Sequence, residues 1–297
     1  MSTSKVRFWT GLGSATVLAA ILPLAAAAQS VRNSNGDRAI DSCNELKIDF
    51  DSRHAIVQTE EKTISKAEAP TLRINASHNG GLQVVGWAKD TYAVTLCKAA
   101  DPEGNPGDTL SKIHLTFHDG ELGVEGPSSH ERWTAQILVK APKSASLDLQ
   151  VSNGPLSLSG VEGNIKVRAQ NGPLTVKSCT GNLELNAQNG PVDLEGNSGK
   201  LNVDAQNGPV TLSLQGTNWT GSGIAAHANN GPLTLHIPSG YQSGVLVESD
   251  GNSPFDCRAK VCSEGRKTWD DRRKSIEFGS GPTMIHLSAM NGPISIN

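Results

Sequence analysis

The chain has 297 residues, which is enough for one or two domains with a sizeable core. Its formal net charge at pH 7 is only −3, so its composition gives no reason to expect nucleic acid or an anionic membrane as a partner. Aromatic residues make up only 4% of the chain, which argues against a long aromatic platform for sugars or bases.

Residues 1–28 have the pattern of a secretory signal peptide. Lys5 and Arg7 precede an uncharged apolar run that ends in alanines, so cleavage is expected after Ala28. The run is nearly long enough to cross a membrane, and an uncleaved anchor is therefore the alternative. Because no second apolar stretch of that length follows, we expect an exported mature chain, in the periplasm or at the cell surface, that does not span a membrane.

Residues 29–70 are predicted to form a polar linker followed by an N-terminal cap. A faint copy of the repeat described next occupies residues 72–87, with the corner Asn79-Gly80-Gly81 and one extra residue upstream that predicts a β-bulge. Further strands are predicted at 113–117, 122–124 and 133–139.

One short motif, Asn-Gly-Pro, returns along the chain and defines the repeat. The first four copies are spaced by 18 residues, and two more follow after insertions, at Asn153, Asn171, Asn189, Asn207, Asn230 and Asn291. A fixed period of about twenty residues is typical of repeat architectures, in which each copy buries its apolar face against its neighbours.

Apolar and polar residues alternate on both sides of each motif. Apolar residues lie six, four and two positions before each Asn, and three and five positions after it, as in Leu183, Leu185, Ala187, Val192 and Leu194. This alternation predicts two strands per repeat, each with one buried face. On the exposed face, Lys166 is expected to lie between Asp148 and Glu184 of neighbouring copies.

Two strand arrangements could join at the Asn-Gly-Pro corner. Asn-Gly is ordinarily a signal for an antiparallel hairpin. Proline argues against the hairpin, because the residue after Gly would have to donate its N–H across the turn and proline has none. We therefore predict an all-β fold, a single-stranded parallel β-solenoid (β-helix) with about 18 residues per coil over residues 71–297, whose stacked asparagines can form a ladder. The pattern does not determine the handedness of the coil.

The period lapses at 238–280, which is predicted to be a non-repeat insertion that covers part of one end of the stack. It contains Cys257 and Cys262, whose spacing suits a disulfide that closes a small loop. Cys43 and Cys97 are a second, weaker candidate pair, which leaves Cys179 as a free thiol. The alternative is that all five cysteines stay reduced, and a zinc site is not expected because no second close cysteine pair exists.

The motifs resemble those of a known bacterial family. Residues 80–87, Ile137 to Pro142 and the repeats from Leu147 onward are similar to a domain-of-unknown-function family of envelope proteins that carry the name adhesin. The resemblance covers roughly residues 70–297 and implies an exported single-stranded β-helix. It brings no catalytic residues with it.

Some parallel β-helices are enzymes that cleave acidic polysaccharides, and this is the alternative function. Asp193 and Glu195 are expected to point outward together, with Arg168 and Asp204 in a nearby row, but two outward carboxylates are what any polar strand face offers. The sequence contains no Gly-rich phosphate loop, Ser-centred elbow or HExxH motif.

Three other patterns could form sites, and each has an ordinary explanation. His114 and His118 share a strand face without an evident third metal ligand. The run Asp270-Asp271-Arg272-Arg273 beside Trp269 can pair with itself. An outward row of hydroxyls could bind a crystal surface, although Asp193 interrupts it and Thr is a common strand residue; its members are Ser157, Thr175, Thr211, Thr234 and Ser295.

The sequence therefore predicts an exported, non-enzymatic scaffold without a cofactor or a metal. We expect it to act as a cell-envelope interaction or adhesin-like protein, with a protein or a polysaccharide as its partner, because repeat proteins of this kind present extended surfaces rather than pockets. The sequence names neither the ligand nor the oligomeric state.

Overall fold

A computed structural model describes residues 29–33, 38–127, 131–250, 253–270 and 273–297. The predicted signal peptide, residues 1–28, lies outside the described residues, as do Asp271 and Arg272 of the charged run. The all-β prediction is confirmed: the described chain is mostly strand, with the helix α1 (Pro106–Lys112) and the short 3₁₀ helices η1 (Cys43–Glu45) and η2 (Lys260–Ser263). No helix in the described parts of the chain is long and apolar enough to cross a membrane.

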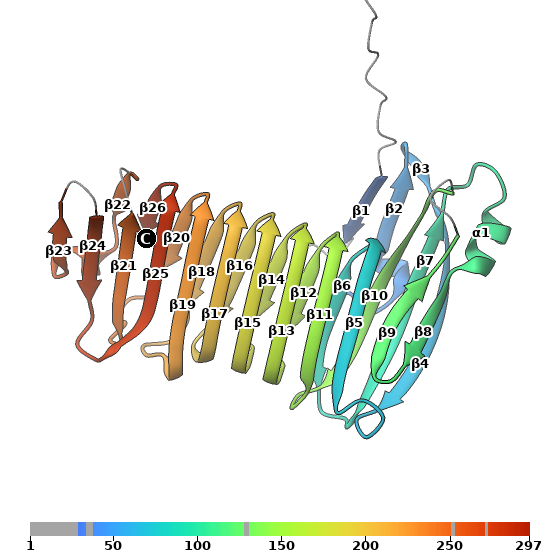
Figure 1. The fold of residues 1–297 in the computed structure, drawn as a ribbon, viewed down its shortest axis with the longest axis horizontal. Coiled ribbons are helices and arrows are strands. Elements are labelled where there is room, and N and C mark those ends of the chain that lie inside the picture. The colour runs from blue at the N-terminus through green and yellow to red at the C-terminus, as the bar shows by residue number, and fades with distance from the viewer. Residues whose placement is uncertain (1–28, 34–37, 128–130, 251–252, 271–272) are drawn as a thin grey trace, which may run out of the picture.

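Two long sheets face each other along the length of the molecule, and a three-stranded sheet lies near one end (Figure 1). The twelve-stranded sheet has the order β23 (Arg266–Trp269), β24 (Arg273–Phe278), β21 (Gly244–Asp250), β25 (Thr283–Asn291), β19 (Thr220–Asn230), β17 (Ser198–Asn207), β15 (Thr180–Asn189), β13 (Glu162–Asn171), β11 (Ser146–Asn153), β5 (Thr71–Asn79), β9 (Glu121–Glu125) and β8 (His114–His118). The eleven-stranded sheet has the order β22 (Phe255–Cys257), β26 (Ile294–Ile296), β20 (Leu233–His236), β18 (Val210–Leu214), β16 (Val192–Gly196), β14 (Leu174–Lys177), β12 (Leu156–Ser159), β6 (Leu82–Trp87), β10 (Trp133–Pro142), β7 (Thr91–Ala100) and β4 (Ile56–Ser65).

Each repeat contributes one strand to each long sheet, and equivalent strands pair in parallel. Leu183, for example, lies opposite Ile165 on one side and Leu201 on the other, an offset of 18 residues each way. The apolar residues of the alternating pattern are buried between the two sheets in every repeat. The core therefore consists of rows of apolar side chains, one from each repeat, and each side chain lies between its equivalents in the two neighbouring repeats.

The Asn-Gly-Pro corners join the two sheets and stack on one another. Each Asn side chain donates a hydrogen bond from Nδ2 to Oδ1 of the preceding Asn, over 2.9–3.1 Å, along the series Asn153, Asn171, Asn189, Asn207, Asn230 and Asn291. At Gly190 the backbone φ is +142°, and a Cβ atom there would lie 2.3 Å from the carbonyl oxygen of Gly172. Glycine is required because the stacked corners are in backbone contact. The strands on either side of a corner enter different sheets, so the antiparallel hairpin alternative is wrong.

At the N-terminal end the parallel pattern gives way to mixed pairing. The first coil is β5 and β6, and its register against β11 shifts by one residue before Asn79, where the sequence predicts a bulge. Strands β10, β7 and β4 then extend the eleven-stranded sheet, with antiparallel β10–β7 and β7–β4 pairs. The segment 29–70 is thus partly regular structure: β4 is an edge strand of a long sheet, and β1 (Gln29–Asn33), β2 (Leu46–Phe50) and β3 (Arg53–His54) form the three-stranded sheet.

At the C-terminal end the order of strands in space differs from their order in the chain. The final repeat, β25 and β26, pairs with β19 and β20 on one side and with β21 and β22 on the other. The chain therefore leaves one position open after β20, forms the outer strands at 244–257, and returns to fill that position with its last residues (Figure 1). The 238–280 segment covers this end by extending both sheets.

Candidate functional site

A groove of about 560 Å³ lies on the outer face of the eleven-stranded sheet, beside the three-stranded sheet. Its wall comes from the N-terminal part of the chain, namely Val31 of β1, the segment 38–40 and Leu46 of β2. Its floor is the outward side of strands β6, β12, β14, β16 and β18. The groove thus brings together segments that lie more than a hundred residues apart in the sequence.

The wall is anchored to the sheet by apolar packing and a disulfide. Leu46, Ile48 and Phe50 of β2 are buried against Ala99 of β7 and Leu138 of β10 in a second, smaller core. The structure joins Cys43 to Cys97 in the same cluster, with 5.3 Å between their Cα atoms. Closing a loop of 54 residues is expected to stabilise the folded state by about 4 kcal/mol in the chain-entropy model.

Hydrogen bonds hold the wall against the floor at the base of the groove. The side chain of Gln83 donates from Nε2 to the carbonyl oxygen of Ile40 over 2.7 Å, and its Oε1 accepts from the Ile40 N–H over 2.8 Å. Nearby, Gln136 Oε1 accepts a hydrogen bond from the N–H of Gly81 over 2.7 Å. Lys140 Nζ also lies 3.0 Å from Asp41 Oδ1. Because these contacts are made within the protein, the groove is formed before any ligand arrives.

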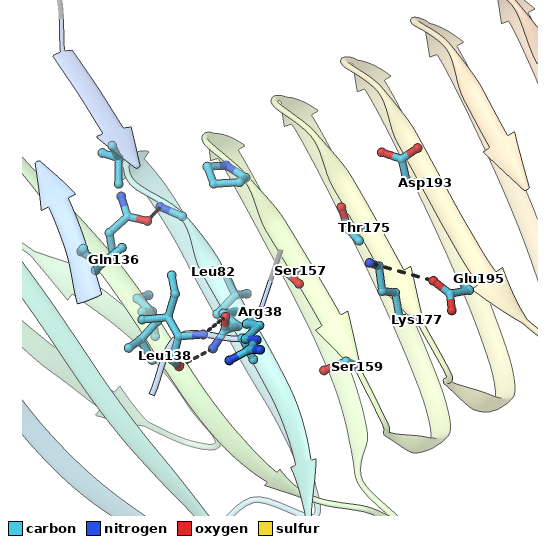
Figure 2. Close-up of a pocket in the computed structure, with 18 of the residues that line it drawn as sticks. Arg38, Leu82, Gln136, Leu138, Ser157, Ser159, Thr175, Lys177, Asp193 and Glu195 are labelled. Carbon is cyan, nitrogen blue, oxygen red and sulfur yellow. Dashed lines mark hydrogen bonds and ion pairs between the residues drawn. The ribbon is translucent and has the colours of Figure 1, made fainter. Parts of the chain in front are cut away.

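The floor consists of two rows of polar side chains on successive strands. Figure 2 shows Ser157, Thr175 and Asp193 in one row and Ser159, Lys177 and Glu195 in the next. The pairing of β12, β14, β16 and β18 places each member beside its counterpart on the next strand, and Thr211 and Ser213 continue the two rows. These side chains point outward because successive residues of a strand face opposite sides, and the intervening residues, such as Val176 and Leu194, are buried in the core.

Two of the charged residues of the floor, Lys177 and Glu195, pair with each other. Lys177 Nζ lies 3.9 Å from Glu195 Oε2, and Gln215 donates a hydrogen bond from Nε2 to Glu195 Oε1. Asp193 is exposed at the centre of the floor. The floor therefore offers hydroxyl groups, amides and a few charged groups, which suits hydrogen bonding to a polar ligand.

The residues of the alternative enzymatic function are divided between two faces. Asp193 and Glu195 lie on β16 of the eleven-stranded sheet, whereas Arg168 is on β13 and Asp204 on β17 of the twelve-stranded sheet. The expectation that these four form neighbouring rows is therefore wrong, because the corner at each Asn sends the two halves of a repeat into different sheets. Arg168 instead pairs with Asp148, with 2.9 Å between Nη2 and Oδ1.

The two histidines weighed as metal ligands bind nearby carboxylates. His114 Nε2 lies 3.3 Å from Glu125 Oε2, and His118 Nδ1 lies 2.8 Å from Asp119 Oδ2. Across the described residues, no group of three or more His, Cys, Asp or Glu side chains is placed to hold a metal ion.

The described residues of the charged run beside Trp269, Asp270 and Arg273, hydrogen-bond to each other. Asp270 Oδ1 accepts a hydrogen bond from the N–H of Arg273 over 2.7 Å, and the Asp270 N–H donates to the Arg273 carbonyl oxygen. Trp269 is 57% exposed, and its ring centroid lies 6.3 Å from that of Phe255. Asp270 and Arg273 therefore hold the adjoining ends of β23 and β24 together.

Two cysteine pairs and one thiol are present. The structure joins Cys257 to Cys262, with 5.9 Å between their Cα atoms, in addition to the Cys43–Cys97 bond. Cys179 is a buried free thiol, and burial raises its pKa to about 11.

The sequence did not reveal the wall of the groove. Val31, Ile40 and Leu46 are ordinary apolar residues in a polar segment, and no motif links them to the hydroxyl row more than a hundred residues later. The only usable signal was the Cys43–Cys97 pairing, which would bring Leu46 close to the sheet.

Comparisons with known proteins give distant likenesses. No family model and no curated protein sequence matches the chain, so the specific family suggested by the motifs is not shown. Similar solved structures include a "putative cell adhesion protein" from Clostridium sporogenes, with 13% identity, a TM-score of 0.37 and coverage of 81% of this chain and 99% of that one. A "putative adhesin" from Bacteroides fragilis has 12% identity, a TM-score of 0.35 and coverage of 81% and 96%. A "putative lipid binding protein" from Parabacteroides distasonis has 12% identity, a TM-score of 0.34 and the same coverage. Likenesses at this level assign no activity to this chain.

Proposed function

We propose that this chain is an exported, non-enzymatic β-solenoid with about 18 residues per coil, and that it acts as an adhesin-like interaction scaffold of the cell envelope. The observation that carries the proposal is the groove beside the three-stranded sheet. A ligand in it would lie across successive coils and contact the same kind of side chain at each one. An extended surface of this kind is what repeat proteins use for binding.

The groove is built to bind rather than to react. Its wall is held by the Cys43–Cys97 disulfide and by the paired hydrogen bonds between Gln83 and Ile40. A preformed site avoids the entropic cost of ordering the protein when the ligand binds. Glu195 is engaged with Lys177 and Gln215, so the two floor carboxylates do not form a free pair of the kind that glycosidases use.

Export is part of the proposal and has its own test. If residues 1–28 are a cleaved signal peptide, the exported protein should begin near Gln29, which is the first residue of β1. N-terminal sequencing of the exported form checks this. An intact Met1 in the membrane fraction would establish an uncleaved anchor instead.

Retention on intact envelopes tests the binding role. Thr175→Tyr places a bulky ring on the floor of the groove, at a half-buried outward position of β14. Asn186→Tyr makes a similar change on the outer face of the twelve-stranded sheet and is the matched control. Both variants should keep the circular dichroism spectrum and the Tm of the parent.

We expect Thr175→Tyr to lower the amount of protein that sediments with envelopes of the host bacterium by about tenfold or more. Asn186→Tyr should sediment like the parent protein. Equal retention of all three proteins, or equal loss from both variants, would show that the groove is not the contact surface.

A further inference from the structure

We infer that the groove receives a neutral, unbranched polysaccharide that lies across successive strands of the eleven-stranded sheet. This inference rests on the proposed function and names the partner of the same site. It comes from four properties of the groove: the repeated hydroxyl groups, the balance of charge, the apolar wall and the continuation of the polar rows past the groove.

Hydroxyl groups recur across the floor at the spacing of the strands. Ser157, Thr175 and Thr211 each occupy the same position of their repeat, with Asp193 in the remaining place. Neighbouring strands lie about 4.8 Å apart, so the floor presents one polar group at each such step. An extended polysaccharide presents hydroxyl groups at a similar step, because one sugar ring has about the length of one strand spacing. Serine and threonine hydroxyls can both donate to and accept from those hydroxyls, and a carboxylate can accept from them.

The charges of the lining favour a neutral ligand over a charged one. Among the residues that the structure describes, the ionisable side chains that line the groove are Arg38, Lys177, Asp193 and Glu195, two of each sign. Lys177 and Glu195 also pair with each other. An acidic polymer would meet Asp193 and Glu195 without a surplus of basic groups to offset them, and binding of charged chains depends on such a surplus.

The wall supplies the apolar part of the contact. Val31 of β1 and Ile40 of the segment between β1 and β2 line the groove and are partly exposed, and the buried Leu46 lies beside them. Sugar rings carry C–H groups on their faces, and these can pack against aliphatic side chains. No aromatic side chain is among the described residues that line the groove. Each sugar is therefore bound weakly, and affinity has to come from many contacts along one chain.

The two polar rows of the floor continue past the groove onto the next strand of the sheet. Beyond Thr211 and Ser213, the same two rows extend through Thr234 and His236 of β20. A ligand longer than the groove can thus continue over further coils. For this reason affinity should rise with the length of the oligosaccharide.

The floor suits a polysaccharide better than a peptide strand. The floor strands β12, β14, β16 and β18 each lie between two hydrogen-bonded neighbours in the sheet. Their backbone groups are occupied, so an extended peptide could not pair with them as an added strand. Recognition has to use the outward side chains, and their hydroxyl and carboxylate groups match the hydroxyls of sugars.

The experiment measures binding of the mature exported protein by isothermal titration calorimetry. The probes are three soluble neutral polysaccharides (a β-glucan, a mannan and an arabinan), their oligosaccharides of increasing length, and polygalacturonate as the acidic polymer. We expect at least one neutral polymer to bind, with an affinity that rises with chain length and changes less than about twofold between 0.05 and 0.5 M salt. Polygalacturonate should bind at least about tenfold more weakly.

Isosteric variants connect this binding to the floor. Thr175→Val and Thr211→Val remove one hydroxyl each and preserve a good strand residue, and each should weaken binding by about threefold to tenfold. Thr180→Val, on β15 of the other long sheet, is the matched control and should bind like the parent.

Three results would overturn the inference: no binding of any neutral polymer, tighter salt-sensitive binding of polygalacturonate, or neutral binding that both groove variants leave unchanged. Its failure can be told from failure of the proposed function. If Thr175→Tyr loses envelope retention but no neutral polymer binds, the groove is a contact surface for another kind of partner. If Thr175→Tyr is fully retained, the proposed function itself is wrong.

Discussion

Replacing one core leucine in a central repeat tests whether the coils are stabilised by one another. Leu185 is 1% exposed in β15 and lies between Val167 of β13 and Val203 of β17. Leu185→Ala removes buried apolar atoms and leaves a cavity that the neighbouring strands, held in register, cannot easily fill. For a site of this kind the loss in the free energy of unfolding is about 3–4 kcal/mol.

The neighbouring residue provides the control. Glu184 points outward, and its Oε2 lies 3.7 Å from Lys166 Nζ in a pair whose side chains are 53% and 61% exposed. Such an exposed pair contributes little, so Glu184→Ala should change the free energy of unfolding by about 0.5 kcal/mol or less. Urea unfolding followed by circular dichroism measures both values.

Hydrogen exchange then locates the damage. Because each coil completes its core with residues of the next, Leu185→Ala should reduce amide protection at 165–169 and 201–205 as well as at 183–187. A loss confined to residues 183–196 would show that the repeats are independent units. If Leu185→Ala lowers the free energy of unfolding no more than Glu184→Ala does, the buried apolar rows do not stabilise the coils.

The remaining predictions concern the corners and the cysteines. Gly190→Ala should lower the free energy of unfolding in urea by about 4 kcal/mol, because its Cβ would lie 2.3 Å from a neighbouring carbonyl oxygen at a φ of +142°. Gly160→Ala is the control: its Cβ would meet open space at a φ of +64°, so it should lower the free energy of unfolding by only about 1 kcal/mol. Equal losses would contradict the stacked corners. Cys179 should resist iodoacetamide at pH 8 in the folded protein, since burial raises its pKa from 9.0 to about 11, and rapid labelling would contradict its burial. The Cys179 thiol ionises at a lower pH in the unfolded chain than in the folded protein. Its contribution to the free energy of unfolding should therefore be complete below about pH 9 and fall as the pH rises toward 11. Urea unfolding measured across this pH range would detect the fall. Peptide mapping of exported material without reductant should find Cys257 linked to Cys262, and free thiols at both positions would disprove the bond.

The strand pattern within the repeats could be predicted from the sequence because it depends on local spacing. Alternation around each corner assigned Leu183, Leu185 and Ala187 to the inside of one strand, and all three are buried. Proline after Asn-Gly excluded the hairpin, since its missing N–H is a property of the residue itself. The same alternation placed Thr175 and Asp193 on an outer face, where they form the floor of the groove.

The groove as a site could not be predicted, because its two sides come from distant parts of the chain. The outward direction of Thr175 follows from its own strand, but the position of Leu46 depends on which surface the N-terminal segment covers. That choice is decided by packing against Leu138 of β10 and by the Cys43–Cys97 bond. Neither contact has a signal in the residues next to Leu46. The assignment of Arg168 to the face of Asp193 failed for a related reason, since only the corner geometry decides which sheet each half of a repeat enters.

The sequence by itself determined that residues 283–296 are a copy of the repeat, because the spacing around Asn291 matches the other copies. It did not determine that this copy lies between β20 and β22, inside strands that precede it in the chain. A repeat motif specifies a strand and its inward face, and these are properties of a few consecutive residues. Which strand becomes its neighbour depends on competition among all the exposed strand edges, and only the tertiary structure resolves that competition.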